Sequence, residues 1–138
     1  MAKSYSQALI NRMNEAKQSS PDIEASAVVS LDGLIMASAL PENLSEDRIS
    51  AMSAAMLSLG EQINKEMGRG ALEQLYTKGD GYVVLLAVGS EAVLTALVKP
   101  EAKLGLLIHE LRKTADDLER ILGEIRAEAQ NEKRTVLP

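Results

Sequence analysis

The stretch YVVLLAVGSEAVLTALV at residues 82–98 decides the fold. It contains two nearly continuous apolar runs of strand length, separated by the turn residues Gly89, Ser90 and Glu91. A strand with one wet face alternates apolar and polar residues, whereas a strand that is covered on both faces is apolar throughout. We therefore expect both runs to lie at the centre of a sheet that helices cover on both sides.

A third strand precedes these two and has a different pattern. Residues 71–78, before the turn Gly79-Asp80-Gly81, alternate apolar and polar side chains only weakly, which is typical of an edge strand. Between Leu72 and Thr77 the sequence has no proline and one charged residue, Glu73. Such an edge is poorly protected against pairing with another strand. We therefore expect symmetric pairing with a second copy of the chain to bury this edge.

A hairpin is predicted further upstream, around Asp32-Gly33. Residues 25–31 have the alternating pattern of a strand, and residues 34–39 have the composition of a second one. Asp-Gly is a preferred pair for the two positive-φ positions of a type I′ turn. We therefore expect the two strands to be antiparallel neighbours joined by that turn.

A helix is predicted to begin after Ser45 and to end at Gly68 and Gly70. Serine accepts a hydrogen bond from a free amide at a helix start, while Glu46 and Asp47 place negative charge against the positive end of the helix dipole. Glycine commonly ends a helix.

This helix carries two distinct surfaces. Large apolar side chains recur every three or four residues, at Ile49, Met52, Met56, Leu59, Ile63 and Met67. Small residues occupy other positions, namely Ser50, Ala51, Ser53, Ala54, Ala55, Ser58 and Gly60. The apolar stripe is the surface that we expect to cover the sheet. The small residues would let another backbone approach closely, so we expect them to pack against a neighbouring helix.

Helices are also predicted at the two ends of the sequence. Tyr5, Leu9, Met13 and Ala16 recur at helical spacing in the first. The last keeps a heptad rhythm at Leu104, Ile108, Leu111, Ala115, Leu118, Leu122, Ile125 and Ala129. From Lys103 to Gln130 it would be about 42 Å long, whereas a strand of seven residues is about 23 Å long. Its end should therefore project, followed by a frayed tail over residues 131–138.

Composition narrows the range of partners. The sequence has 15 basic and 20 acidic residues, a net charge of −5, no cysteine, no Phe or Trp, and three tyrosines. Negative charge repels nucleic acid and anionic lipid. Few aromatic side chains are available on which nucleic-acid bases could stack. No apolar run approaches the roughly 20 residues of a membrane span. We expect a cytoplasmic protein that neither binds nucleic acid nor inserts into a membrane.

Catalytic and cofactor motifs are not evident in the sequence. No motif places a Ser or Cys nucleophile beside the single histidine, His109. One histidine without any cysteine also does not make a typical zinc site. The glycines at 60, 68 and 70 do not form a phosphate-binding loop, because the required lysine and the strand-to-helix context are missing. We therefore expect no enzyme activity, no metal or other cofactor and no bound nucleotide.

The element order and three segments together resemble the Roadblock family, which includes the dynein light chain Roadblock and the bacterial MglB-like GTPase regulators. The segments are AVVSLDGLIMA at 27–37, VVLLAVG at 83–89 and LGLLIHELR at 104–112. The resemblance covers about residues 5–122 and implies one α+β domain at 1–122, with the extension of the last helix at 123–138. The implied order is α-β-β-α-β-β-β-α, with an antiparallel sheet of strand order 2-1-5-4-3, helix two on one face and helices one and three on the other.

The resemblance also implies a homodimer and a partner. Two copies would pair through their third strands and lay their second helices side by side, with the interface at Ser50, Ala54, Leu57, Leu72, Leu75 and Tyr76. Family members are platforms for small Ras-like GTPases or subunits of motor and signalling assemblies. The residues that we expect to contact a GTPase are Arg48, Glu61, Asn64, Lys65 and Arg69, polar groups that the core does not need.

Two other functions stay open. A structural adaptor subunit of a motor or signalling assembly would touch no GTPase, and the extended last helix favours it. A small-molecule sensor domain would need a polar-lined pocket and aromatic groups that hold a ligand. Because Phe and Trp are absent, the sensor ranks third.

Overall fold

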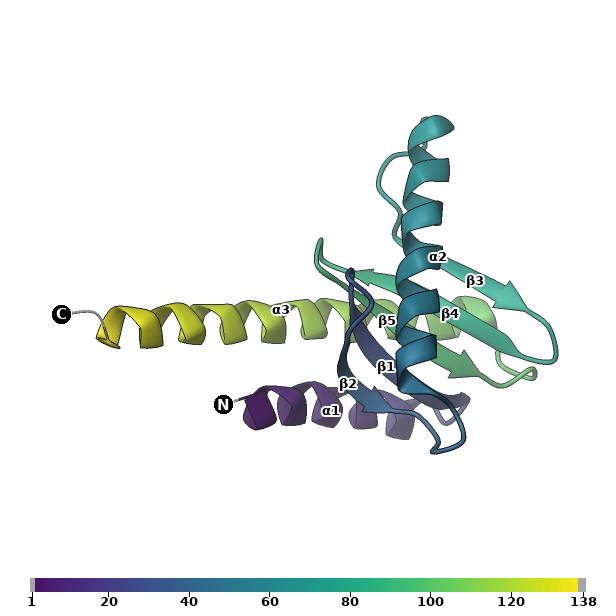
Figure 1. Cartoon of the computed structure of the whole chain (residues 1–138). Coiled ribbons are helices and arrows are strands. Elements are labelled where there is room, and N and C mark those ends of the chain that lie inside the picture. Colours follow the sequence, from purple (N-terminus) through teal and green to yellow (C-terminus); the bar gives the residue numbers. More distant parts are fainter. Residues whose placement is uncertain (1, 137–138) are drawn as a thin grey trace.

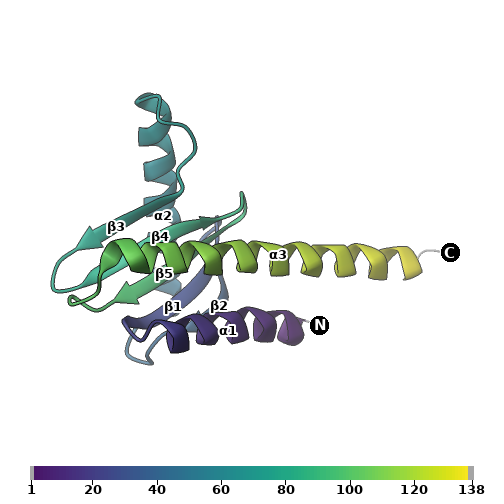
Figure 2. The same cartoon turned by 180° about the vertical axis from the view of Figure 1, so that it is seen from behind.

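The computed structural model describes residues 2–136, and the side chains of residues 7–132. Five strands form one antiparallel sheet of order β2-β1-β5-β4-β3. The elements in chain order are α1 (Ala2–Ser19), β1 (Ile23–Ser30), β2 (Ile35–Ala39), α2 (Glu46–Glu66), β3 (Gln74–Lys78), β4 (Tyr82–Val88), β5 (Ala92–Val98) and α3 (Leu104–Val136). Helices α1 and α3 cover one face and α2 crosses the other (Figures 1 and 2). The predicted fold is confirmed.

The larger core lies between the sheet and the pair α1 and α3. Strands β4 and β5 alternate across the sheet, and Val84, Leu86 and Leu94 turn to this side. Leu9 and Met13 of α1 pack here, as do heptad residues of α3 as far as Leu122. The side chain of Tyr5, the first residue of the predicted stripe in α1, lies outside the described residues. Burial on both faces explains why β4 and β5 are apolar throughout.

The smaller core lies under α2. Leu57 of α2 packs on Leu85 and Val93 of the sheet, and Leu72 closes the cluster. The Thr95 hydroxyl donates a hydrogen bond of 2.9 Å to the Ser53 hydroxyl, and both side chains are buried. This pair joins the centre of the sheet to the middle of α2.

The hairpin between β1 and β2 forms, but its turn differs from the predicted type I′. Gly33 has φ of +85°, and none of the described residues other than glycine has positive φ, so Asp32 cannot occupy a type I′ position. The Gly33 amide donates to the Ser30 carbonyl and the Ser30 amide donates to the Leu34 carbonyl. These bonds enclose a loop of three residues, for which one left-handed glycine suffices. The β1–β2 register also shifts between Val28 and Val29.

The ends of α2 and α3 test the predicted helix boundaries. Ser45 caps α2 as expected, because its hydroxyl accepts a hydrogen bond from the Arg48 amide, and Gly68 follows the helix with φ of +66°. Helix α3 continues to Val136 and not to Gln130. The predicted frayed tail is therefore helical up to Val136, and residues 137–138 lie outside the described residues. The far end of α3 projects beyond α1 and the sheet (Figures 1 and 2).

Candidate interaction surface

Helix α2 crosses the strands and runs past one edge of the sheet (Figure 1). Ser53 lies over β5, and Leu57 lies over the β4 and β5 residues Leu85 and Val93. At Gly60 the helix reaches the start of β3, since a Cβ on that glycine would lie 2.6 Å from Leu72 Cδ2 and 3.0 Å from Leu75 Cδ2. The last turns of α2, after Gly60, therefore extend beyond β3, where the chain has no further strand to support them.

The faces of α2 differ from the prediction. Ser50, Ser53, Ala54 and Leu57 are its buried residues and face the sheet. Most of the predicted apolar stripe points away from the core. The sheet already presents large side chains to α2, so small helical residues let the helix pack close to them. Packing within one chain thus explains Ser50, Ser53 and Ala54, whereas Ala51, Ala55 and Ser58 stay exposed.

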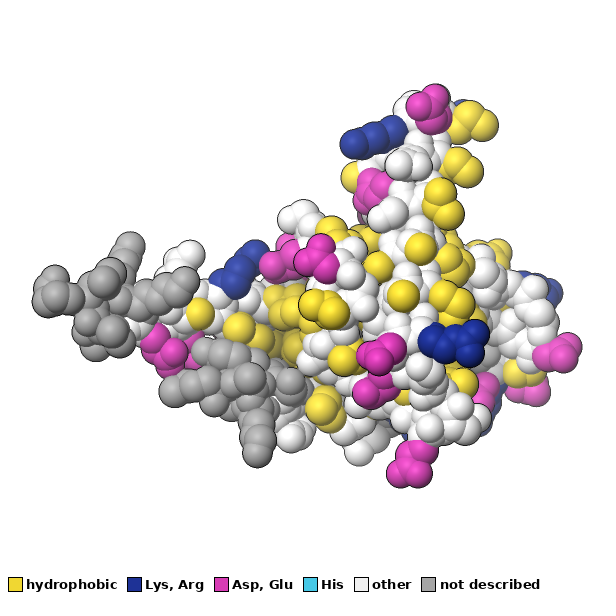
Figure 3. All heavy atoms as spheres, in the orientation of Figure 1, with side chains coloured by type: hydrophobic (Ala, Val, Ile, Leu, Met, Phe, Trp, Pro, Cys, Tyr) yellow, Lys and Arg dark blue, Asp and Glu magenta, His cyan; other side chains and the backbone are white. Residues whose placement is uncertain are grey.

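Four large apolar side chains of α2 are exposed as a result. We call Met52, Leu59, Ile63 and Met67 the α2 stripe; their side chains are 52%, 63%, 64% and 71% exposed. Figure 3 shows apolar atoms along α2 up to its projecting end. Single exposed apolar residues are common, but a continuous row of them usually marks a binding surface. The row is continuous here because its members are spaced by four or seven residues along a helix.

An apolar groove runs beside the stripe, between α2 and the strands. We call it the α2–β4 groove. It has a volume of about 180 Å³, and its walls include Ile49, Met52 and Met56 of α2 together with Val83 and Leu97 of the sheet. The hydrogen-bonded Ser53 and Thr95 side chains also line it. The groove lies on the side of α2 that faces β4 and β3, so it is continuous with the edge of the sheet.

The edge strand β3 pairs with β4 only, and within the described residues no element covers its outer side. The Tyr76 ring is 50% exposed and meets Tyr82 edge-on, with ring centroids 6.0 Å apart. Arg112 of α3 holds the start of the strand through an ion pair of 2.7 Å with Glu73 and a hydrogen bond to the Gln74 side chain. These contacts lie at the start of β3, and the outer edge of the strand stays open.

The predicted dimer-interface residues divide into two groups. Ser50, Ala54, Leu57 and Leu72 are buried within a single chain, with Ser50 only 1% exposed. They present little surface to a second copy, and their assignment to an interface stays a prediction. Leu75 is partly buried and Tyr76 is exposed, so these two remain available at the edge.

The predicted GTPase-contacting residues do not form one cluster. Arg48 is exposed in the first turn of α2, whereas Lys65 and Arg69 are exposed at the far end. Arg48 and Lys65 are about 25 Å apart along the helix. Glu61 and Asn64, on the last turns, are partly buried. Four of the five thus share the projecting end of α2, and Arg48 stands apart.

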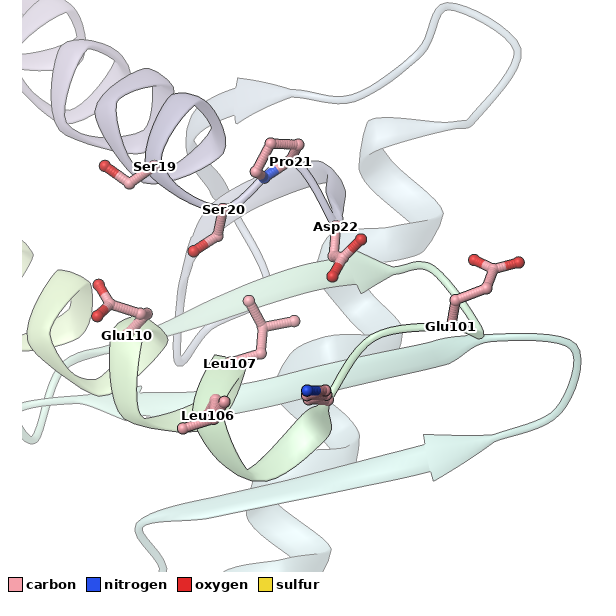
Figure 4. A pocket seen from close by; sticks show the side chains of 9 residues that line it. Ser19, Ser20, Pro21, Asp22, Glu101, Leu106, Leu107 and Glu110 are labelled. Atoms are coloured by element: carbon pink, nitrogen blue, oxygen red, sulfur yellow. The ribbon is translucent and has the colours of Figure 1, made fainter.

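A second cavity of about 360 Å³ lies between the end of α1 and the start of α3 (Figure 4). Asp22, Glu101 and Glu110 line it together with one basic residue, Lys103. Its negative charge disfavours phosphate groups, so a nucleotide is a poor match for it. Within the described residues, no three His, Asp or Glu side chains are grouped closely enough to hold a metal ion.

Two further features bear on the predicted chemistry. His109 is exposed on α3. Across residues 2–136 no helix has the length and apolar composition that crossing a membrane requires.

Comparison with known proteins identifies relatives of this fold. The family model for the Roadblock/LC7 domain matches residues 9–98. An uncharacterised protein of Methanocaldococcus jannaschii is 30% identical over 110 residues, which cover 80% of this chain and 96% of that protein. The structure of Myxococcus xanthus MglB has a TM-score of 0.73 at 19% identity, covering 80% of this chain and 90% of that one. A structure described as MglB with tetrameric arrangement has a TM-score of 0.79 at 16% identity, covering 87% and 91%.

Proposed function

The chain belongs to the Roadblock/LC7 domain family, and from this we infer that it is a non-catalytic homodimeric regulator or scaffold that binds a small Ras-like GTPase. Family membership supports a regulatory or adaptor domain, and the MglB structures share its fold. The dimer and the GTPase are our proposal. The observation that carries it is the end of α2, which extends past its own sheet with large apolar side chains exposed.

A second copy related by a two-fold axis beside β3 would cover that end. Its sheet would continue this one, so the last turns of each α2 would lie over the other copy. There they meet the α2–β4 groove, whose apolar walls suit Ile63 and Met67. Burying such a row of side chains is the main source of stability in a helix-mediated dimer. The same axis joins the two open β3 edges and removes the unpaired amides of both.

The GTPase is proposed to bind across the paired second helices and to prefer the GTP-bound state. This proposal rests on family resemblance, and the exposed ends of α2 support it. Lys65 and Arg69 lie near Glu61 and Glu66 at the projecting end, and Arg48 follows Glu46 and Asp47 at the start, so both ends present charges of both signs. The resemblance to the bacterial MglB-like regulators implies action by reshaping the GTPase rather than by inserting an arginine finger, and we propose this mode of action for the chain.

The structural adaptor is the second candidate, and α3 is the observation that favours it. The helix has 33 residues, and Leu122 is its last buried heptad residue. Ile125 is partly buried against the core, and Arg126 forms an ion pair with Glu91. Residues 123–132 are exposed or half-buried. We propose that the segment 123–138 is an extension outside the folded domain, which a larger assembly could hold. The chain can be truncated after Ile125 to separate the adaptor function from GTPase binding. Loss of binding to the larger assembly, with GTPase binding retained, would show that the two functions are distinct.

A small-molecule sensor ranks below both. The cavity between α1 and α3, at about 360 Å³, falls within the roughly 300–1,000 Å³ of small-molecule pockets, but no aromatic side chain lines it. The α2–β4 groove is smaller, at about 180 Å³. Its walls are almost wholly apolar and contain no aromatic ring.

The test is a pull-down with tagged native protein, followed by single-turnover GTP hydrolysis with any GTPase recovered. Alanine variants of Arg48, Glu61, Asn64, Lys65 and Arg69 are compared with wild type. Lys113→Ala, an exposed lysine on α3, serves as the matched control. Loss of binding in variants of α2 but not in the control is expected. Binding that survives all five substitutions would move the site off α2, and absence of any GTPase would favour the adaptor.

A further inference from the structure

The pairing of β3 with β4 determines which amides of β3 point outward. The Ala87 amide donates to the Glu73 carbonyl with a distance of 3.0 Å, and the register continues with Leu75 opposite Leu85 and Thr77 opposite Val83. In an antiparallel pair, every second residue directs both its amide and its carbonyl to the neighbouring strand. The odd-numbered residues of β3 therefore bond to β4. The even-numbered residues, Gln74, Tyr76 and Lys78, direct their backbone groups to the open edge.

A two-fold axis perpendicular to the sheet restricts how two such edges can pair. Such an axis keeps both copies of α2 on the same face of the sheet. Residues that lie opposite each other must therefore be both even-numbered or both odd-numbered. Among the registers that satisfy this condition, one uses all three outward residues of each copy. It places Gln74 opposite Lys78 of the second copy and Tyr76 opposite Tyr76. The axis could instead pass through Leu75 or through Thr77. In either case one outward-facing residue of each β3 strand would have no partner strand residue to bond to.

The side chains agree with this register. Tyr76 keeps half of its ring exposed while the rest contacts Tyr82, so a second Tyr76 would complete an aromatic cluster across the axis. Aromatic pairs on opposite strands stabilise a sheet. The register also keeps the two Lys78 ammonium groups apart, and places each opposite Gln74, whose side chain is held by Arg112 beside the carboxylate of Glu73.

Resting on the proposed homodimer, we propose that Tyr76 lies on the two-fold axis, opposite Tyr76 of the second copy. The tyrosine is then the centre of a continuous sheet through both copies. Leu75 lies opposite Thr77 of the second copy on the α2 face.

The absence of cysteine from the sequence allows a direct test. Opposite residues in a hydrogen-bonded antiparallel pair have Cα atoms about 5.5 Å apart, within the roughly 4.4–6.8 Å that a disulfide bridges. Leu75 and its counterpart in the second copy would not lie opposite each other but two residues apart along the strands. Their Cα atoms would then be about 8 Å apart. Tyr76→Cys should therefore form a covalent dimer under mild oxidation at least ten times faster than Leu75→Cys or Thr77→Cys. Leu75→Cys combined with Thr77→Cys should cross-link as readily as Tyr76→Cys.

The combined variant retains Tyr76, so the register can be tested even if the loss of the tyrosine ring disturbs the fold. Faster cross-linking of Leu75→Cys or Thr77→Cys alone would place the axis at that residue and overturn the proposal. So would a wild-type dimer, by light scattering, in which neither Tyr76→Cys nor the combined variant cross-links. A monomeric wild-type chain would instead refute the homodimer itself.

Discussion

Shortening Ile63 to alanine should weaken the association of two copies without weakening the fold of each. The Ile63 side chain is 64% exposed in the single chain, so it adds little to the core. Exposed substitutions of this kind change the free energy of unfolding by no more than about 0.5 kcal/mol. Alanine is also the better helix former.

The expected loss of dimer stability follows from the exposed fraction. Full burial of an isoleucine side chain contributes about 1.5–3 kcal/mol. Because Ile63 is 64% exposed, covering it would contribute about 1–2 kcal/mol in each chain. The two-fold axis repeats the contact, which gives about 2–4 kcal/mol per dimer. The dissociation constant should therefore rise about 30- to 700-fold, since a tenfold change corresponds to about 1.4 kcal/mol.

Sedimentation equilibrium measures that constant directly. Leu106→Ala is the matched control, because Leu106 is 69% exposed and lies on α3, away from α2. Its dissociation constant should stay within threefold of wild type. Urea unfolding at a concentration where every variant is monomeric should give the same midpoint for all three proteins. An Ile63→Ala protein that dimerises as tightly as wild type would refute the reasoning.

Three further predictions concern the fold and its chemistry. Leu57→Ala should destabilise the chain by about 2–5 kcal/mol, measured by urea unfolding, because it leaves a cavity between α2 and the sheet, where Leu57 is buried. Ser53→Ala should cost about 1–3 kcal/mol by leaving the buried Thr95 hydroxyl unpaired, whereas Ser53→Ala combined with Thr95→Val should be closer to wild type; equal loss in both would show that the hydrogen bond is unimportant. Calorimetric titration of the isolated chain with GTP or ATP should show no binding, and micromolar affinity for either would contradict the absence of a phosphate-binding loop.

The sheet could be predicted from the sequence because burial on two faces leaves a direct mark on composition. Strands β4 and β5 are apolar at nearly every position, and only a central position explains that pattern. The edge strand was recognisable by the opposite signal. The hairpin was predicted correctly but not its turn, since Asp32-Gly33 suits both a two-residue and a three-residue loop. The choice between them depends on the register of the flanking strands.

The orientation of α2 could not be predicted from periodicity. A helical pattern shows that large and small residues lie on different faces, but either face can cover a sheet. Which one does so depends on the side chains that the sheet presents, here Leu85 and Val93, and on the length of helix that has a sheet beneath it. Because the last turns of α2 extend past β3, Ile63 has no core to enter. This is why Ser50 is buried, while Ile63 and Met67 of the predicted apolar stripe are exposed.

The mass of the wild-type chain in solution tests the central claim most directly, namely that a second copy covers the projecting end of α2. One chain has a mass of 14.9 kDa. Size-exclusion chromatography with light scattering at micromolar concentration should give twice that value for wild type and a lower, concentration-dependent value for Ile63→Ala. A wild-type mass of 14.9 kDa across the same range would contradict the claim.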